Sequence, residues 1–258
     1  PGVFWENPQE AGRAGNPAAT EWTNFGGDKS WPAPQSRWPE ITGRVWPPPA
    51  GFDATPATWE RRGDAVDMLS AIDPHYGIRV RRTIRLDPRL ARLTVRTTFE
   101  NVTGEARELA VWVITQLRSP ELVALTAPGG FRELGDASSA TQTWGQWISL
   151  RRDPHRSAKI GALSANLLWI GATDVLRIHA ALQPGARYPD GDSSVEVYTS
   201  PDPTPYVELE VLGPLATLQP GGTLTQVSTY RLSRRRLLDP HHEAERLLFP
   251  PVAHNGGG

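Results

Sequence analysis

Residues 78–86 read Ile-Arg-Val-Arg-Arg-Thr-Ile-Arg-Leu, and residues 93–100 read Leu-Thr-Val-Arg-Thr-Thr-Phe-Glu. In both stretches apolar residues alternate with arginine, threonine or glutamate, which is the period-two pattern of a half-buried β-strand. The link Asp87-Pro88-Arg89 between them is short, so the two strands should form an antiparallel pair.

The same signals recur along the rest of the chain. Six further segments are predicted to be strands, each bounded by Gly, Pro, Asp or Ser: 108–118, 144–151, 175–182, 195–199, 206–212 and 224–232. No long internal repeat is visible, which disfavours a propeller or a solenoid. The sequence therefore predicts an all-β, antiparallel fold whose main sheets occupy residues 76–232.

The two ends of the chain differ from this middle. Residues 1–60 hold six of the ten tryptophans among many prolines and glycines, a composition that predicts ordered loops pinned by aromatic side chains. Near the other end Asp239 can cap a helix and Pro240 suits its first position, which predicts one short helix over 239–248. We expect no longer helix anywhere, and we expect this one to cover a sheet edge or end.

Composition narrows the class of protein. The 258 residues, 38% hydrophobic and 21% charged, suit one large β domain over 1–258, because sandwiches of this length commonly do not divide. A formal net charge of -1 disfavours nucleic acid or an anionic membrane as partner. The absence of cysteine excludes disulfides, thiolate nucleophiles and Cys-ligated metals.

Other classes are excluded by missing patterns. The longest apolar runs, 110–114 and 167–170, fall far short of the roughly 18 to 20 residues that span a bilayer. No nucleotide-binding or hydrolase motif is present, so we expect no cofactor. The chain opens at Pro1, which is consistent with removal of a preceding segment, so a cytoplasmic or an exported location stays open, as does the oligomeric state.

The most distinctive stretch is residues 24–35, Asn-Phe-Gly-Gly-Asp-Lys-Ser-Trp-Pro-Ala-Pro-Gln, followed by Trp38-Pro39. Two later stretches accompany it: Trp-Val-Ile-Thr-Gln at 112–116, and Tyr-Val-Glu-Leu-Glu-Val-Leu-Gly-Pro at 206–214, which runs on to Pro220-Gly221. Together they resemble an uncharacterised bacterial family of the galactose-mutarotase-like superfamily. The resemblance covers about residues 3–232.

This resemblance implies a β-supersandwich, in which two large antiparallel sheets face each other and one curved sheet lines a cleft. Relatives bind monosaccharides or oligosaccharides there. Members usually begin with a few strands ahead of the position where this chain starts, so the N-terminal edge of the sandwich is expected to be missing or shortened. The family has no assigned activity, so the resemblance implies fold more strongly than function.

Two glutamates are candidates for a catalytic base. Mutarotation needs a base that takes the anomeric hydroxyl proton and an acid that protonates the ring oxygen. Glu208 and Glu210 stand two apart in a predicted strand, so both carboxylates project to one side. In relatives a glutamate shortly before the Pro-Gly turn is the base, and the local context makes Glu210 the first candidate and Glu208 the second. The alternative is an exposed sheet face with two ordinary carboxylates.

The acid is harder to assign. In sugar epimerases of the superfamily it is a histidine on a central strand, whereas the strand that looks equivalent here ends in Gln116, which cannot transfer a proton. His179, alternating with Arg177, is the best substitute. The alternative for His179 is a structural role, which is the commoner one for a lone histidine on a strand.

Several residues could hold a ligand, each with a structural alternative. Lys29 follows a Gly-Gly pair and, with Asp28, could grip sugar hydroxyls or a sugar carboxylate, or form an ion pair that fixes the loop. Trp31 and Trp38 offer flat faces for a sugar ring, or simply pin loops. We predict that one cleft gathers the following residues: Lys29, Trp31, Gln35, Gln116, Glu208 and Glu210.

Two charged clusters give weaker signals. Arg79 and Arg81 share one strand face and could bind an anion bidentately, although a solvated basic face is more common. Asp190-Gly191-Asp192, with Glu196 nearby, groups oxygens of the kind that bind calcium, but a turn explains the same pattern. We therefore predict no metal.

The leading hypothesis is recognition of a carbohydrate in a cleft of the concave sheet. The alternative is a sugar 1-epimerase in which Glu210 is the base and His179 the acid. A third hypothesis is a structural or accessory β-domain without a ligand. The geometry of Glu210 and His179 separates them, because catalysis requires the two groups to face one another across about one sugar ring.

Overall fold

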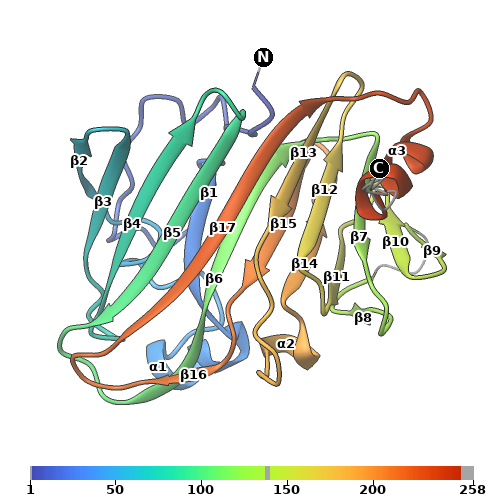
Figure 1. Ribbon diagram of the computed structural model, residues 1–258. Coiled ribbons are helices and arrows are strands. Elements are labelled where there is room, and N and C mark those ends of the chain that lie inside the picture. The colour runs from blue at the N-terminus through green and yellow to red at the C-terminus, as the bar shows by residue number, and fades with distance from the viewer. Residues whose placement is uncertain (1, 137–139, 251–258) are drawn as a thin grey trace, which may run out of the picture.

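The computed structural model describes residues 2–136 and 140–250, which form two antiparallel β-sheets packed face to face (Figure 1). The order of the seven-stranded sheet is β1-β6-β15-β14-β11-β8, with β16 paired to the start of β6. The order of the ten-stranded sheet is β2-β3-β4-β5-β17-β13-β12-β7-β10-β9. The predicted all-β supersandwich is confirmed.

The strands of the seven-stranded sheet are β1 (Asp28–Ala33), β6 (Arg107–Arg118), β8 (Arg132–Glu133), β11 (Ala158–Ala162), β14 (Val195–Thr199), β15 (Tyr206–Leu212) and β16 (Ala216–Leu218). Those of the ten-stranded sheet are β2 (Thr58–Arg62), β3 (Ala65–Ile72), β4 (Ile78–Asp87), β5 (Arg92–Asn101), β7 (Leu122–Thr126), β9 (Thr141–Trp144), β10 (Trp147–Leu150), β12 (Asn166–Ile170), β13 (Asp174–His179) and β17 (Thr223–Arg234).

The main core lies between the sheets. On β15 the buried side chains of Val207, Leu209 and Val211 point inward and pack with Leu176 and Ile178 of β13. Because side chains alternate across a strand, the residues between these point to the outer face of each sheet. The alternation read from the sequence thus fixes which residues meet between the sheets and which face outward.

The β4–β5 pair is antiparallel, as the short link predicts. Its register runs from Ile78 opposite Asn101 to Asp87 opposite Arg92. Inward, Val80, Val95 and Phe99 are buried. The polar partners of the alternation, mostly arginine and threonine, lie on the outer face of the ten-stranded sheet.

Other strands differ from the prediction for identifiable reasons. Residues 144–151 form part of a hairpin, β9 and β10, that turns at Gly145 and is not one strand. β7 and β12 were not predicted, because Val123 and Leu125 of β7 face the core while Leu122 and Ala124 pack in a second apolar cluster with Ala244. A strand covered on both faces shows an apolar run and no alternation.

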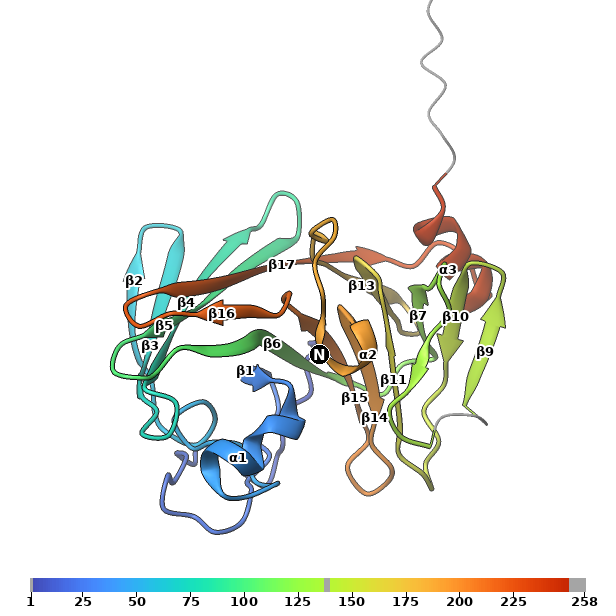
Figure 2. The ribbon, with the colours of Figure 1, turned by 90° about the horizontal axis from the view of Figure 1, so that it is seen from below.

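The N-terminal 60 residues are more regular than predicted. The motif at 24–35 supplies β1, which pairs with β6, and a 3-10 turn, η1 (Gln35–Arg37), followed by α1 (Trp38–Thr42). The helical turns of this N-terminal segment lie beside β1, which is the edge strand of the seven-stranded sheet (Figure 2). Its tryptophans do pin the loops: the rings of Trp22, Trp38 and Trp46 contact Trp31 at centroid distances of 6.2, 5.8 and 5.7 Å.

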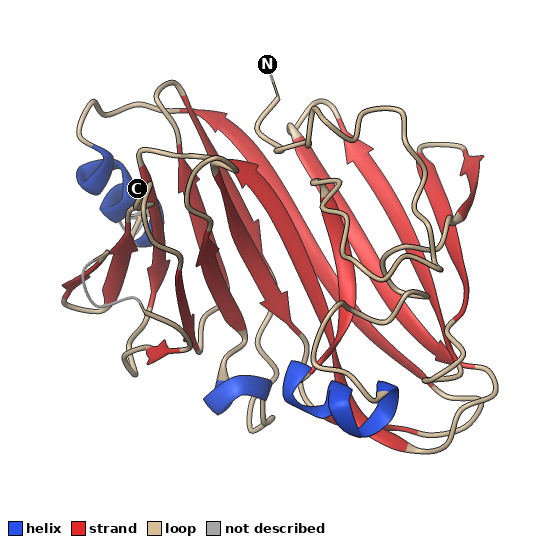
Figure 3. Cartoon of the chain, turned by 180° about the vertical axis from the view of Figure 1, so that it is seen from behind, coloured by secondary structure: helices blue, strands red, loops and turns tan. Residues whose placement is uncertain are grey.

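Two short helices lie at strand ends, as the view from behind shows (Figure 3), and a third covers the outer face of the ten-stranded sheet. α2 (Pro189–Asp192) is a single turn, and α3 (Pro240–Leu248) is the longest helix of the described residues. As predicted, the Asp239 carboxylate caps α3 by accepting from the backbone N–H groups of His241 and His242. No helix in the described part of the chain is long and apolar enough to cross a membrane.

Candidate functional site

The outer face of the seven-stranded sheet carries two rows of charged and polar residues. The first row contains Lys29 of β1, Glu210 of β15 and Glu196 of β14, with the apolar Ile114 of β6 between Lys29 and Glu210. The second row contains these residues: Gln116, Glu208, Tyr198 and Lys159, on β6, β15, β14 and β11. Residues directly opposite in a ladder point to the same side, so one sheet face collects them all.

Lys159 joins the carboxylates of this face. Its Nζ lies 2.7 Å from Glu196 Oε2 and 3.2 Å from Glu210 Oε2, and it stands 4.6 Å from the centroid of the Trp112 ring. Trp112 Nε1 also donates to Glu210 Oε2 at 2.7 Å. Glu196 and Glu210 are 1% and 0% exposed, so the single charge of Lys159 is shared between two buried carboxylates.

The charged groups in this cluster shift one another's pKa values. Burial alone would lower the pKa of Lys159, but the neighbouring Glu210 and Glu196 outweigh it and the pKa is raised, which keeps Lys159 cationic. Burial raises the pKa of Glu196 well above the ordinary value, while Lys159 opposes that shift and Glu210 adds to it. The site therefore holds more carboxyl groups than cations to balance them.

Glu208 is the accessible carboxyl of the pair at 208 and 210, since it is half-buried whereas Glu210 is fully buried. Burial and then the charge of Glu210 raise the pKa of Glu208 to about 7, against opposing effects of Lys29, Gln116 and Lys159. Gln116 Nε2 donates to Glu208 Oε1 at 2.7 Å. A carboxyl that titrates near neutral pH and reaches the surface is suited to accept or donate a proton.

Lys29 stands on the same face, half-buried among aromatic rings. Its Nζ lies 4.9 Å from the centroid of Trp22 and 5.8 Å from that of Trp31, and it donates to Asn24 Oδ1 at 3.3 Å. Burial lowers the pKa of Lys29, although Asp53, Glu208 and Asp28 act against that shift. Among the described residues no carboxylate oxygen lies within 4.0 Å of this ammonium group, so the ion pair considered for Asp28 and Lys29 is not formed.

Four buried side-chain oxygens on this face lack a hydrogen-bond partner within the described residues. They are Gln116 Oε1, Glu210 Oε1 and both carboxylate oxygens of Glu196, of which Oε2 forms the ion pair with Lys159. An orphaned buried acceptor costs about 1 to 3 kcal/mol, so such atoms are rare in folded proteins and need an explanation. A ligand with hydroxyl groups could satisfy acceptors of this kind.

Asp28 points the other way, into the space between the sheets. It forms an ion pair with Arg82 Nη2, and its Oδ2 accepts from Thr115 Oγ1 at 2.6 Å and from Tyr230 Oη at 2.7 Å. Burial and then Asp28 raise the pKa of Tyr230, so its hydroxyl stays a donor. The expected sugar contact of Asp28 is therefore replaced by an internal network in which both carboxylate oxygens are partnered.

The predicted gathering of residues forms only in part. Lys29, Gln116, Glu208 and Glu210 share the outer face, but Trp31 and Trp38 are 4% and 0% exposed and so cannot stack on a sugar ring. Gln35 does not join these residues. The backbone N–H of Gln116 donates to the carbonyl oxygen of Gly27, just before β1, whereas Gln35 follows the other end of β1. The six residues of β1 separate the two glutamines by about 20 Å at 3.3 Å per residue.

His179, Arg79 and Arg81 lie on the other sheet. His179 alternates with the core residue Ile178, so it faces outward from the ten-stranded sheet, where its Nδ1 is 3.0 Å from Asn166 Oδ1. Glu210 faces outward from the seven-stranded sheet, so the expected base–acid pair is not formed. Arg79 and Arg81 share Glu100, at 2.7 Å each. The two arginines therefore form surface ion pairs with Glu100 and lie on the other sheet from Glu208 and Glu210.

Residues 190–192, whose sequence fits either a calcium site or a turn, form a turn. Asp190 and Asp192 have φ of 51° and 70°, which is a tight turn with left-handed residues. The Asp192 carboxylate accepts from the backbone N–H of Tyr188 at 2.8 Å. Within the described residues no group of three His, Cys, Asp or Glu side chains could hold a metal ion. Glu196, considered with this turn, binds Lys159 and is also an electrostatic neighbour of Asp190.

Sequence reasoning missed Lys159, Glu196 and Tyr198 as members of this face. The alternation of Val195 and Val197 with Glu196 and Tyr198 could have placed the latter pair outward. Lys159 gave only a compositional signal, as one of two lysines in an arginine-dominated chain. Arg82 was hidden because it occupies a core-facing position of β4, where the alternation predicts an apolar residue.

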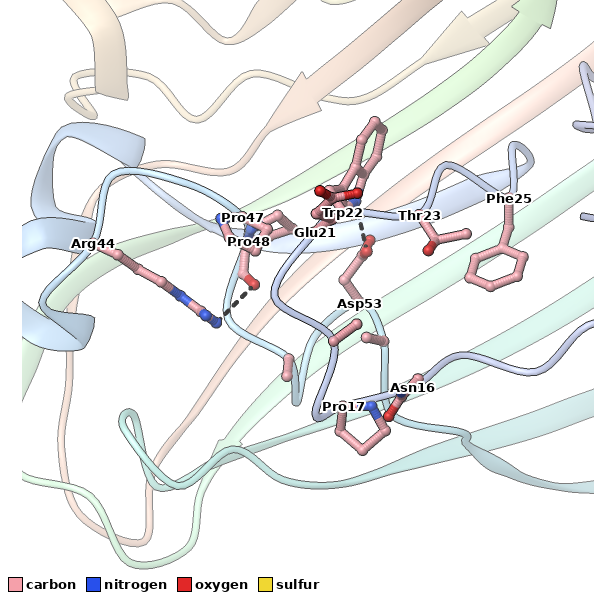
Figure 4. Close-up of a pocket in the computed structure, with 13 residues that line it drawn as sticks. Asn16, Pro17, Glu21, Trp22, Thr23, Phe25, Arg44, Pro47, Pro48 and Asp53 are labelled. Atoms are coloured by element: carbon pink, nitrogen blue, oxygen red, sulfur yellow. Dashed lines mark hydrogen bonds between the residues drawn. The ribbon is translucent and has the colours of Figure 1, made fainter.

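A small cavity lies among the N-terminal loops beside Trp22 (Figure 4). Trp22 Nε1 donates to Asp53 Oδ2 at 2.8 Å there, and Trp31 Nε1 donates to Asp53 Oδ1 at 2.9 Å. The cavity measures about 20 Å³, which is room for about one water molecule. Its polar groups therefore fix the loops, and it is too small for a sugar ring.

Several solved structures with a similar fold are of mutarotase-like proteins. A protein from Salmonella typhimurium assigned provisionally as a mutarotase aligns with a TM-score of 0.58 and 11% identity over 90% of this chain and 80% of its own. A provisional aldose 1-epimerase from Escherichia coli K12 gives 0.52 and 13% over 71% and 69%. A galactose mutarotase-like protein from Lactobacillus casei gives 0.52 and 10% over 70% and 74%.

These likenesses establish the fold. At 10 to 13% identity they do not carry a substrate or a reaction over to this chain. No protein-family model matches the chain, and a search of curated proteins finds no match. Function has to be argued from the residues of the outer face.

Proposed function

We propose that the protein binds a carbohydrate on the outer face of the seven-stranded sheet, around Glu208. The observation that carries the proposal is the half-buried Glu208, hydrogen-bonded to Gln116 and set between Lys29 and the Lys159 cluster. Carboxylate, amide and ammonium groups together can both accept from and donate to sugar hydroxyls. The unpartnered Oε1 atoms of Gln116 and Glu210 add acceptors that a hydroxyl-rich ligand would satisfy.

A second candidate function, sugar 1-epimerase, is favoured by the pKa of about 7 at Glu208. A base works best when its pKa lies near the working pH. In this version Glu208, and not Glu210, takes the anomeric proton, because Glu210 is fully buried and bound by Trp112 and Lys159. Lys29, whose pKa burial lowers, would donate to the ring oxygen in place of a histidine.

Polarimetry and NMR on freshly dissolved α-D-galactose and α-D-glucose test both versions. Binding seen as saturation transfer to sugar protons, with anomer interconversion at the buffer rate, supports recognition alone. Interconversion above that rate supports the epimerase. Neither binding nor interconversion, across a wider panel of neutral and acidic sugars, would leave the structural-domain hypothesis and overturn the proposal.

The matched variants are Glu208→Gln and Glu133→Gln. The second lies on β8, an exposed strand of the same sheet, and makes the same chemical change away from the face. For an epimerase, Glu208→Gln should lower the rate by roughly 10² to 10⁴-fold and largely keep binding. For a binding protein it should weaken affinity by about 1 to 3 kcal/mol. Glu133→Gln should change neither.

A further inference from the structure

Five arginines surround one hollow on the outer face of the ten-stranded sheet, beside α3. The hollow measures about 330 Å³, which is at the lower end of small-molecule pockets. Val175 of β13 and Leu247 of α3 give it apolar walls. Its arginines come from β13, β17, the connection after β17, and α3: Arg177, Arg231, Arg234, Arg236 and Arg246.

Only part of this charge is balanced within the described residues. Arg246 binds Glu243 at 2.6 Å, and Arg234 binds Asp174 at 3.1 Å. Among the residues in 2–136 and 140–250, no carboxylate lies within 4.0 Å of the side chains of Arg177, Arg231 or Arg236. Three positive charges thus line a hollow whose lining residues include no Asp or Glu. Arg177 is held in place there because its Nε and Nη2 donate to Asn166 Oδ1, a neutral acceptor, at 3.0 and 2.7 Å.

Two of these arginines are direct neighbours in the sheet. Arg177 of β13 stands opposite Arg231 of β17, and Arg231 in turn stands opposite Arg92 of β5. Like charges directly opposite each other destabilise a sheet. Burial and then the charge of Arg231 lower the pKa of Arg177. The arrangement carries an electrostatic cost that a bound anion would relieve.

We propose that this hollow binds a multivalent tetrahedral oxyanion, namely the phosphate or sulfate group of a small molecule. Guanidinium groups match such oxyanions because their planar N–H pairs donate two parallel hydrogen bonds. Three unbalanced arginines suit a group with two negative charges better than a single carboxylate. Because this hollow and Glu208 lie on opposite outer faces of the sandwich, the site is independent of the proposed carbohydrate function.

The probes are inorganic phosphate, sulfate and pyrophosphate, titrated by calorimetry at constant ionic strength with chloride as the balancing anion. We expect saturable binding, and thermal unfolding shifted upward by the binding anion relative to chloride. The tighter of the phosphate and sulfate titrations identifies which class of ester the site prefers. No saturable heat with any of the three anions overturns the proposal.

The test variant is Arg231→Gln, and its matched control is Arg96→Gln. Arg96 is exposed on the same sheet face but does not line the hollow. Arg231→Gln should weaken anion binding about tenfold or more, the effect of losing a charged hydrogen bond, whereas Arg96→Gln should leave it within about twofold.

Folding of the variant is checked without ligand. Arg231→Gln removes a repulsion, so its unfolding temperature in chloride should equal or exceed that of the unaltered protein. Equal weakening by both variants would mean a diffuse basic surface and overturn the site. Binding confined to a long sulfated glycan, with no response to the small anions, would overturn it as well.

Discussion

Two polar clusters lie back to back on the same strands of this protein, and they differ in how completely their hydrogen bonds are made. Asp28 and Thr115 point between the sheets, where Arg82 and Tyr230 complete the bonding of the Asp28 carboxylate. Their chain neighbours Lys29 and Gln116 point outward to the face of Glu208, Glu210 and Lys159. We call these the inner cluster and the outer cluster.

This difference is the reason why we assign the inner cluster to the fold and propose a ligand for the outer cluster. Both oxygens of the Asp28 carboxylate have hydrogen-bond or ion-pair partners within the protein, so a ligand is not needed to satisfy the inner cluster. The outer cluster keeps unpartnered acceptors on Gln116 and Glu210, an accessible Glu208, and cations held close to it. Incomplete bonding in a folded protein is a reason to look for a ligand.

The largest effect on the free energy of unfolding is expected from a substitution that breaks the inner cluster. Arg82→Met leaves the Asp28 carboxylate without its cation between the sheets, which should lower the free energy of unfolding by about 3 to 5 kcal/mol. Urea melts measure this loss. Adding Asp28→Asn should recover part of it, because no unpaired charge then remains. A loss below about 1 kcal/mol in Arg82→Met would show that the inner cluster does not hold the sheets together.

The next effect concerns Lys159 in the outer cluster. Lys159→Met removes the cation that Glu196 and Glu210 share, and because Lys159 itself is partly exposed we expect a loss of about 1 to 3 kcal/mol at pH 8, the cost of leaving buried acceptors unsatisfied. The loss should shrink toward pH 5, because the buried carboxyls can then take up protons instead of remaining charged. Melts of both proteins at the two pH values check the trend. A loss that does not depend on pH would contradict the shared-cation interpretation.

The sequence predicted the sandwich better than it predicted either cluster. The alternation of apolar and polar residues predicted which side chains of β4, β5 and β15 face the core, because a one-residue shift in strand register would expose all of the apolar side chains. It could not show that Arg82 fills a core position, since only the position of Asp28 across the sandwich makes a buried arginine tolerable. It also paired Glu210 with His179, because strand periodicity does not tell which sheet a strand joins.

Replacing Glu208 should have an effect on stability of similar size but opposite sign. Its folded-state pKa of about 7 lies above the ordinary value, so its contribution to stability is complete below pH about 4.5 and is lost as the pH rises through about 7. Glu208→Gln stays neutral at every pH and should gain about 1 to 3 kcal/mol over the unaltered protein at pH 8, with no gain at pH 4. Melts across this range measure the difference. An equal difference at both ends would place the Glu208 pKa at its ordinary value.

The smallest effect on stability is expected from Gln116→Met, and its control is the adjacent Thr115→Val. Gln116→Met loses one hydrogen bond to Glu208 but also removes an unpartnered buried oxygen, so the two effects should cancel to within about 0.5 kcal/mol. Thr115→Val removes a donor from the Asp28 carboxylate and also the 3.1 Å hydrogen bond between Thr115 Oγ1 and Tyr230 Oη, which should cost about 1.5 to 3 kcal/mol. Sugar affinity should respond in the reverse order, falling in Gln116→Met and holding in Thr115→Val. If Gln116→Met destabilised the fold as much as Thr115→Val and left affinity unchanged, the outer cluster would be structural too, and the distinction between the two clusters would fail.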